Sequence, residues 1–249
     1  WVAALAPHKY TLIAILAGGR TTGKAGKFTF GAINVQTGDD EAAGIDSANF
    51  TVLRAKRDIL RRSSIGGMFT HRTATPGRTG ANEGYGLDAA MSFYQNVRFD
   101  AYLAATDTDG RDSDNLSYRG SFDYNADKYG VQAERLVVEP NFLPEIGFVR
   151  RTDMRRNFGL ARYSPRPRGV PNLRKLTTQA SLNYVTNNQD RLDTREASGR
   201  VETEFTNSDL FSVVYTDSFE RLVRPFPIAA GVTLPVGRYG FHTRRMRDG

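Results

Sequence analysis

The chain has 249 residues, a formal net charge of +7, no cysteine and a mean hydropathy of −0.47. Without cysteine there is neither a disulfide framework nor a thiolate metal site. The longest apolar run, around 10–17, is too short to cross a bilayer as a helix. A membrane β-barrel remains open, because only every second residue of a spanning strand faces lipid and the overall hydropathy therefore stays low.

Stretches in which apolar and polar residues alternate recur along the chain, and this period of two predicts β-strands. We expect about twelve strands, each near the length that a tilted membrane-spanning strand requires. They are 10–18, 27–37, 49–60, 63–72, 85–94, 97–106, 116–124, 128–138, 154–163, 174–186, 192–205 and 210–219.

The predicted strands are joined alternately by tight polar turns and by long polar loops. The turns are RTTGK (20–24), RRSS (61–64), QN (95–96), NADK (125–128) and TNSD (206–209), and the loops are 37–48, 72–84, 106–116, 138–153 and 186–191. Short turns at one end and long loops at the other are typical of barrels in the bacterial outer membrane. We therefore predict one all-β domain over 1–249, an antiparallel up-and-down transmembrane β-barrel.

The last part of the chain, 221–249, departs from this rhythm. Three prolines interrupt the segment RPFPIAAGVTLPVGRYGFHTRR, which predicts a long loop followed by a further strand that starts near Tyr239. The chain does not end on an aromatic terminal strand, and from Trp1 onward it lacks the charged region, apolar region and cleavage site of a secretory signal. We expect the visible strands to be part of a larger barrel, with a signal removed or located upstream.

Charged and polar side chains keep to one face of each predicted hairpin, where they would line a hydrated lumen. These candidate lumen-lining residues are Arg98, Asp100, Arg119, Asp123, Gln132, Glu134, Gln179, Arg200, Glu202 and Glu204. The opposite face mixes Ala and Gly with larger apolar residues, which suits a lipid-facing band better than a tightly packed core. Tyr and Phe recur near strand ends, as at a membrane–water boundary.

Three blocks of sequence point to a family. They are NFTVLRAKRDILRRSSIGGMFTHR (49–72), NFLPEIGFVRRTDMRRNFGLARYSPRPR (141–168) and VRPFPIAAGVTLPVGRYGF (223–241). Together they resemble a bacterial outer-membrane barrel module of unknown function that usually follows a family 9-like carbohydrate-binding domain. The resemblance implies an outer-membrane barrel connected with glycan handling and implies no catalytic residues. The carbohydrate-binding domain itself is absent from this chain.

Two clusters are candidate ligand sites. Asp107, Asp109, Asp112 and Asp114 offer hard oxygen ligands of the kind that calcium prefers, although the spacing fails the EF-hand pattern and a solvated acidic loop is the favoured interpretation. Arg150, Arg151, Arg155 and Arg156 either bind anions or brace the barrel by pairing with acidic residues, and the structural role is favoured. The apolar segment PNFLPEIGF (140–148) predicts a loop folded into or over the lumen.

No catalytic motif is present, and the three histidines are far apart in sequence, so we do not expect an enzyme. Scattered basic residues do not form a nucleic-acid footprint. The sequence favours an outer-membrane pore or envelope transport component that is surrounded by lipid. The family resemblance implies carbohydrate-derived solutes, and we expect no cofactor unless calcium binds. One alternative is a plugged structural barrel whose loops bind an envelope protein or a surface glycan. Another is a soluble exported carbohydrate-binding β-sandwich.

Overall fold

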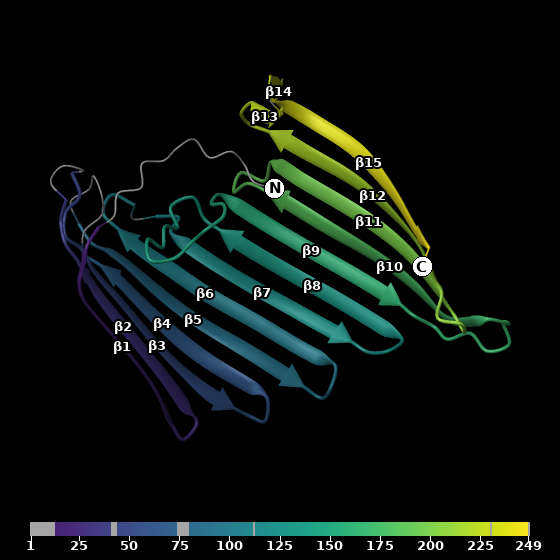
Figure 1. The fold of residues 1–249 in the computed structure, drawn as a ribbon, viewed down its shortest axis with the longest axis horizontal. Helices are drawn as coiled ribbons and strands as arrows, with labels where there is room; N and C mark the ends of the chain where they lie inside the picture. The colour runs from purple at the N-terminus through teal and green to yellow at the C-terminus, as the bar shows by residue number, and fades with distance from the viewer. Residues whose placement is uncertain (1–12, 41–43, 74–79, 112, 230, 249) are drawn as a thin grey trace.

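The computed structural model describes residues 13–40, 44–73, 80–111, 113–229 and 231–248, and most of them belong to one antiparallel sheet of thirteen strands (Figure 1). The strands follow each other in chain order across this sheet, so the predicted all-β, antiparallel, up-and-down architecture is confirmed. They are β1 (Ile15–Ala25), β2 (Phe28–Thr37), β3 (Asn49–Ile59), β4 (Ser63–Arg72), β5 (Asn82–Phe93), β6 (Val97–Thr108), β7 (Leu116–Asn125), β8 (Tyr129–Val138), β9 (Met154–Tyr163), β10 (Leu173–Thr186), β11 (Leu192–Phe205), β12 (Leu210–Leu222) and β15 (Gly237–Asp248).

A small separate hairpin lies between β12 and β15. Its strands are β13 (Phe226–Ala229) and β14 (Val232–Leu234). The tail is therefore not the single long loop that its prolines predict. The further strand expected near Tyr239 does form, as β15, and it pairs with β12 from Leu222↔Gly237 to Phe211↔Asp248.

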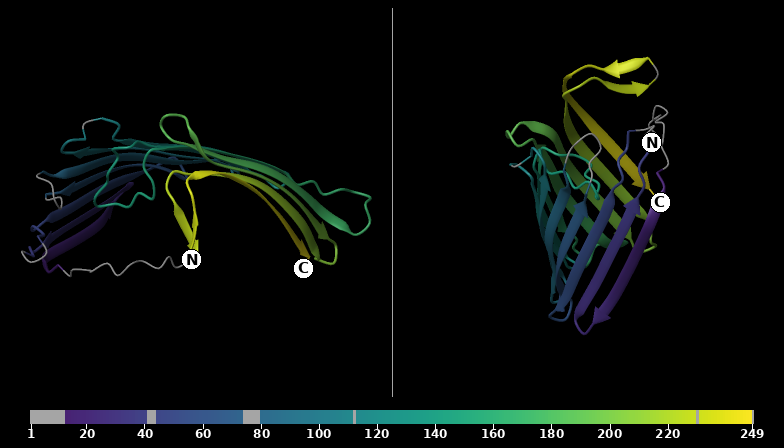
Figure 2. Two further views of the ribbon diagram at one scale, coloured as in Figure 1. Left: turned by 90° about the horizontal axis from the view of Figure 1, so that it is seen from above. Right: turned by 90° about the vertical axis from the view of Figure 1, so that its left-hand side faces the viewer.

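The sheet is an open arch (Figure 2). Among the described residues, β1 and β15 each pair with one neighbour only and not with each other. The closed barrel that the sequence predicts is thus not formed by these strands. The sheet curves in one direction along its whole width, but the curvature is too gentle to bring its two outer strands together.

The strands are staggered steadily across the sheet. One row of directly paired residues begins at Phe28, the first residue of β2, and ends at Tyr184, near the last residue of β10; it runs through Arg57, Ile65, Ala89, Ala101, Gly120, Arg135 and Asn157. Between β2 and β10 this row crosses eight strand pairs. Over the same distance it shifts from the short-turn end of the strands almost to the long-loop end, which is nearly a full strand length. With a strand spacing of about 4.8 Å and a rise of about 3.3 Å per residue, this stagger corresponds to a tilt of roughly 40°, the range found in closed barrels.

The first hairpin differs from its prediction. The segment RTTGK (20–24) lies inside β1, and the turn falls at Gly26 and Lys27, because Ala25 pairs directly with Phe28. Gly26 has a φ of 59°, a conformation that glycine adopts without steric penalty and that tight hairpin turns require. The beginning of the predicted strand 10–18 lies outside the described residues. The other eleven predicted strands match the observed ones to within three residues at each end.

The sheet encloses almost no conventional core. Only five apolar side chains among the described residues are buried: Ala48, Val137, Val138, Phe142 and Val185. Large apolar side chains elsewhere are exposed, including Leu87 at 66 % and Leu103 at 50 %. The described residues contain no helix that is long and apolar enough to span a membrane. The arrangement is therefore maintained mainly by strand pairing and by contacts across the polar face.

Candidate functional site on the concave face

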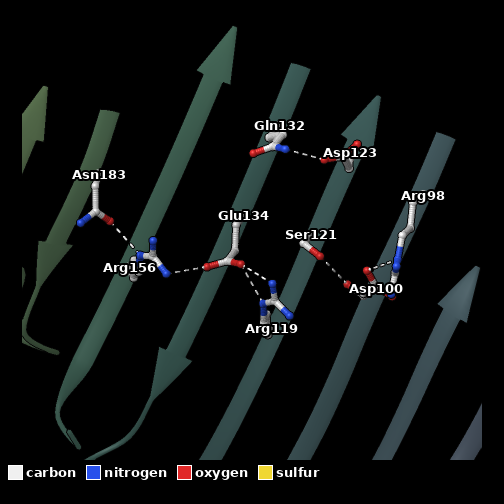
Figure 3. A network of polar contacts seen from close by, with 9 residues as sticks. All are labelled: Arg98, Asp100, Arg119, Ser121, Asp123, Gln132, Glu134, Arg156 and Asn183. Carbon is white, nitrogen blue, oxygen red and sulfur yellow. Dashed lines mark hydrogen bonds and ion pairs between the residues drawn. The ribbon is translucent and has the colours of Figure 1, made fainter. Parts of the chain in front are cut away.

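The concave face of the arch carries a polar network that crosses four strands (Figure 3). Glu134 on β8 is its centre. Its carboxylate accepts a hydrogen bond of 2.8 Å from Nε of Arg119 on β7 and one of 3.1 Å from Nη1 of Arg156 on β9. Arg156 also donates to Oδ1 of Asn183 on β10, at 2.7 Å. One carboxylate thus joins two cations, and neighbouring strands are cross-linked as opposite charges on one sheet face allow.

The other candidate lumen-lining residues lie on the same face, because directly paired residues share a face and the register connects them. Arg98 donates to Asp100 at 2.7 and 3.0 Å, and Gln132 donates to Asp123 at 2.6 Å. Arg200 pairs with Glu202, and Glu204 pairs with Arg174 at 2.9 Å. Gln179 is directly opposite Arg200 in the register. The structure therefore brings the predicted set together on one face, as an internally paired surface.

The arginine cluster predicted at 150–156 is divided by the fold. Arg155 and Arg156 are consecutive in β9 and point to opposite faces, so Arg155 pairs with Asp190 at 2.8 Å while Arg156 joins the concave network. Arg151 pairs with Asp193. Arg150 is exposed and makes no hydrogen bond or ion pair within the described part of the chain. Three of the four arginines thus have the bracing role, and no common anion site gathers all four.

The connection 139–153 folds over the concave face. Asn82, which is fully buried on β5, donates from Nδ2 to the carbonyl oxygen of Leu143 at 2.9 Å and accepts from the backbone N–H of Glu145 at 3.2 Å. Thr106 on β6 accepts from the backbone N–H of Leu143 at 3.0 Å, and Arg72 pairs with Glu145 at 3.3 Å. The loop thus lies over the face that carries the predicted lumen-lining residues.

Asp193 ties this loop to the C-terminal strands. Its side chain is 5 % exposed and pairs with Arg151 of the loop and with Arg221 of β12, whose Nε lies 2.9 Å from Oδ1. Burying an ionised carboxylate is costly unless opposite charges pair with it, and here two arginines do so. Sequence reasoning missed both Asp193 and Asn82. Neither belongs to a recognisable motif, and only the boundary between loop and strand marks their positions.

A cavity of about 950 Å³ lies where the loop 139–153 and the segment that leads into β13 cover the concave face. Its walls come from β3 to β9 and include Met68, Tyr102, Leu136 and Val138. The loop contributes Phe142, Phe148 and Arg150, and the C-terminal part contributes Asp193, Arg221, Val223, Arg224 and Phe226. Apolar side chains from both the strands and the loop form much of its lining.

The convex face carries many apolar side chains and is bordered by aromatic rings. It is not free of charge, contrary to what the sequence predicts: Arg135 donates to Asn157 on this face, and Arg195 pairs there with Asp217. Near the short turns, rings gather at Phe93 and Phe99, with centroids 6.2 Å apart, and at Tyr129 and Tyr163, 5.4 Å apart. Near the long loops, Phe69 and Tyr85 have ring centroids 5.4 Å apart. Polar residues such as Glu83 lie beyond this second border, closer to the loops.

In the turn between β7 and β8, Lys128 lies beside the first aromatic border. Its Nζ is 5.3 Å from the centre of the Tyr129 ring and 5.5 Å from that of Tyr163. A hydrogen bond with Tyr129 is the main cause that raises the pKa of Lys128 above its usual value. A lysine close to tyrosine rings is a common arrangement at the edge of an apolar band.

The acidic loop gives no sign of the calcium site considered above. Asp112 lies outside the described residues, while Asp107, Asp109 and Asp114 are exposed. Among the described residues, no group of three or more His, Cys, Asp or Glu side chains is placed to hold a metal ion.

Comparisons with models of known protein families, with curated proteins and with solved structures found no match. The resemblance to an outer-membrane barrel module therefore stays a prediction from the three sequence blocks, and the functional argument depends on the geometry of the sheet.

Proposed function

We propose that this chain forms part of the wall of a β-barrel in a bacterial outer membrane, and that the barrel is a pore or transport component of the envelope. One observation carries the proposal. The convex face exposes large apolar side chains such as Leu87, Leu103 and Leu182, and the sheet encloses only five buried apolar side chains in the described residues. Exposed apolar area of this extent is unfavourable in water, and a bilayer is the surrounding that removes the penalty.

The spacing of the two aromatic borders supports the same proposal. Tyr85 and Phe93 lie on the convex side of β5, one at each border. They are separated by about 26 Å along the strand, or about 20 Å along the membrane normal at a tilt of roughly 40°. This height is comparable with the apolar band of outer-membrane barrels, about 25 Å, which aromatic girdles also flank.

The proposal requires that β1 and β15 pair with strands other than those described. Within hydrocarbon, each unpaired backbone N–H or C=O costs several kcal/mol, so an open sheet edge is not tolerated there. In the completed barrel the concave face would line the interior, with the network around Glu134 hydrating and bracing it. The carbohydrate-derived solutes implied by the family resemblance remain a prediction, and we propose no catalytic activity.

The position of the loop 139–153 favours a second candidate function. Its contacts with Asn82, Thr106 and Arg72 fix it on the concave side, where it would narrow or plug the interior. A plugged barrel would act as a structural or interaction protein whose exposed loops bind an envelope partner or a surface glycan. Ion conductance distinguishes the two candidates.

The first experiment has two steps. Detergent-extracted protein is run on SDS gels with and without boiling, and a mobility shift on boiling is expected for a closed barrel that resists SDS. The same preparation is then reconstituted in planar bilayers. Steady channels support a pore, whereas a heat-modifiable protein that stays silent supports the plugged barrel. Solubility without detergent and no shift on boiling would contradict both candidates.

A further inference from the structure

We infer that the cavity beneath the loop 139–153 is a binding site for an amphipathic organic anion, that is, a small molecule with an acidic group and an apolar body. This inference rests on the proposed function in one respect, because it assigns a solute class to the interior of the barrel. The cavity of about 950 Å³ lies at the upper end of the usual range for small-molecule sites.

The charges around the cavity favour an anion. Its walls contain five arginines and only two aspartates; the arginines are Arg54, Arg150, Arg151, Arg221 and Arg224, and the aspartates are Asp88 and Asp193. Both aspartates are already neutralised, Asp88 by Arg54 and Asp193 by Arg151 and Arg221. Within the described part of the chain, Arg150 and Arg224 make no hydrogen bond or ion pair. Two guanidinium groups are thus free to bind a carboxylate, sulfonate or phosphate group.

The apolar part of the wall favours a ligand that is more than an inorganic ion. Phe148 is 87 % exposed, Val223 is 65 % exposed and Phe226 is 53 % exposed, although all three border the cavity. Large apolar side chains on an otherwise polar face expose area to water that an apolar ligand would cover. Leu136, Val138 and Phe142 continue this surface inward and include two of the few buried apolar residues of the sheet. At the floor, the hydroxyl groups of Tyr102 and Ser117 are hydrogen-bonded to each other at 3.1 Å.

The structure therefore places two unpaired cations beside an apolar wall in one concave site. A simple anion would leave the apolar wall uncovered, and an amphipathic cation would be repelled by the excess of arginines. A neutral apolar molecule would leave the arginines without partners. Only a molecule that joins an anionic group to an apolar body satisfies both parts of the site.

The test uses the whole chain in maltoside micelles and isothermal titration calorimetry, with empty micelles as the blank. The probe is naphthalene-2-sulfonate. Two comparison ligands each remove one feature: sulfate has no apolar body, and 2-naphthylmethylammonium has the same body with the opposite charge. We expect the sulfonate to bind at least about tenfold more tightly than either comparison ligand. Equal binding of the sulfonate and the ammonium compound would overturn the inference.

Variants then locate the site. The double variant Arg150→Gln with Arg224→Gln is expected to weaken binding of the sulfonate by about tenfold or more, as loss of charge-assisted contacts requires. The matched control is Arg61→Gln with Arg62→Gln, which removes two exposed arginines from the turn between β3 and β4, at the opposite end of the strands. Phe148→Ala with Phe226→Ala tests the apolar wall and is expected to weaken sulfonate binding as well. Unchanged binding in both cavity variants would overturn the assignment.

Failure of this inference can be distinguished from failure of the proposed function. A protein that is heat-modifiable and conducts ions, but does not bind the sulfonate, would overturn the ligand site and leave the pore. A protein that binds the sulfonate and is soluble without detergent would overturn the membrane proposal and leave the site.

Discussion

Glu134 and Arg156 lie on the neighbouring strands β8 and β9 and are joined across the concave face, with Oε1 3.1 Å from Nη1. The same carboxylate also pairs with Arg119, and it is only 13 % exposed, whereas each arginine is exposed by more than a third. Glu134 is thus the shared acceptor of two cations. Its removal affects three strands at once.

We therefore predict that Glu134→Gln destabilises the sheet. The substitution keeps the size of the side chain but leaves Arg119 and Arg156 without their common counter-charge, which should lower the free energy of unfolding by about 1–2 kcal/mol. The measurement is the temperature at which the folded, fast-migrating band is lost on SDS gels. Glu202→Gln is the control, since its pair with Arg200 is more exposed and should contribute about 0.5 kcal/mol or less. Equal shifts in the two variants would contradict the central role of Glu134.

A second prediction concerns the loop 139–153. Asn82→Ala removes the side-chain contacts to Leu143 and Glu145 that fix the loop on the concave face. We expect the loop to open more often and trypsin to cleave at Arg150 or Arg151 several-fold faster than in the unmodified protein, because cleavage follows the population of the open form. Asn96→Ala, in the turn before β6, is the control. If Asn82→Ala leaves cleavage at its original rate, the loop is held by other contacts.

A third prediction compares adjacent residues on opposite faces of β10. Leu182 lies on the convex face and Ser181 on the concave face. In a bilayer, Leu182→Arg should destabilise the protein by about 2–4 kcal/mol if it lies near the midplane, whereas Ser181→Arg should cost about 1 kcal/mol or less. Urea titrations of the vesicle-bound protein measure both values. Similar costs for the two substitutions would show that the convex face does not contact hydrocarbon.

The sequence was most informative where alternation was clean. In β6 and β7 the large apolar residues and the charged residues occupy opposite faces along most of each strand, and the predicted ends lie within two residues of the observed ones. In β1 the polar stretch RTTGK looked like a turn because it lacks large apolar residues, but only Gly26, two residues further on, supplies the backbone conformation of the turn. The prolines of 221–249 concealed the short hairpin β13–β14.

The polar contacts were harder to predict than the strands. Alternation assigned Glu134 and Arg119 to one face, but the identity of their partners depends on the register, which is set across many strands. The arginines at 150–156 formed one cluster in the sequence and several separate contacts in the fold, since adjacent strand residues point in opposite directions. Asp193 acquires its role only when the loop 139–153 and β12 come together, a long-range contact that no local pattern encodes.

The central claim, that lipid covers the convex face, is tested most directly by spin-label accessibility along β10. The chain contains no cysteine, so single cysteines can be introduced from Thr178 to Tyr184 and labelled without a background signal. In vesicles, we predict that labels at 178, 180, 182 and 184 are more accessible to oxygen, which dissolves in the bilayer. Labels at 179, 181 and 183 should be more accessible to a water-soluble nickel complex. High nickel accessibility at all seven positions would contradict the claim.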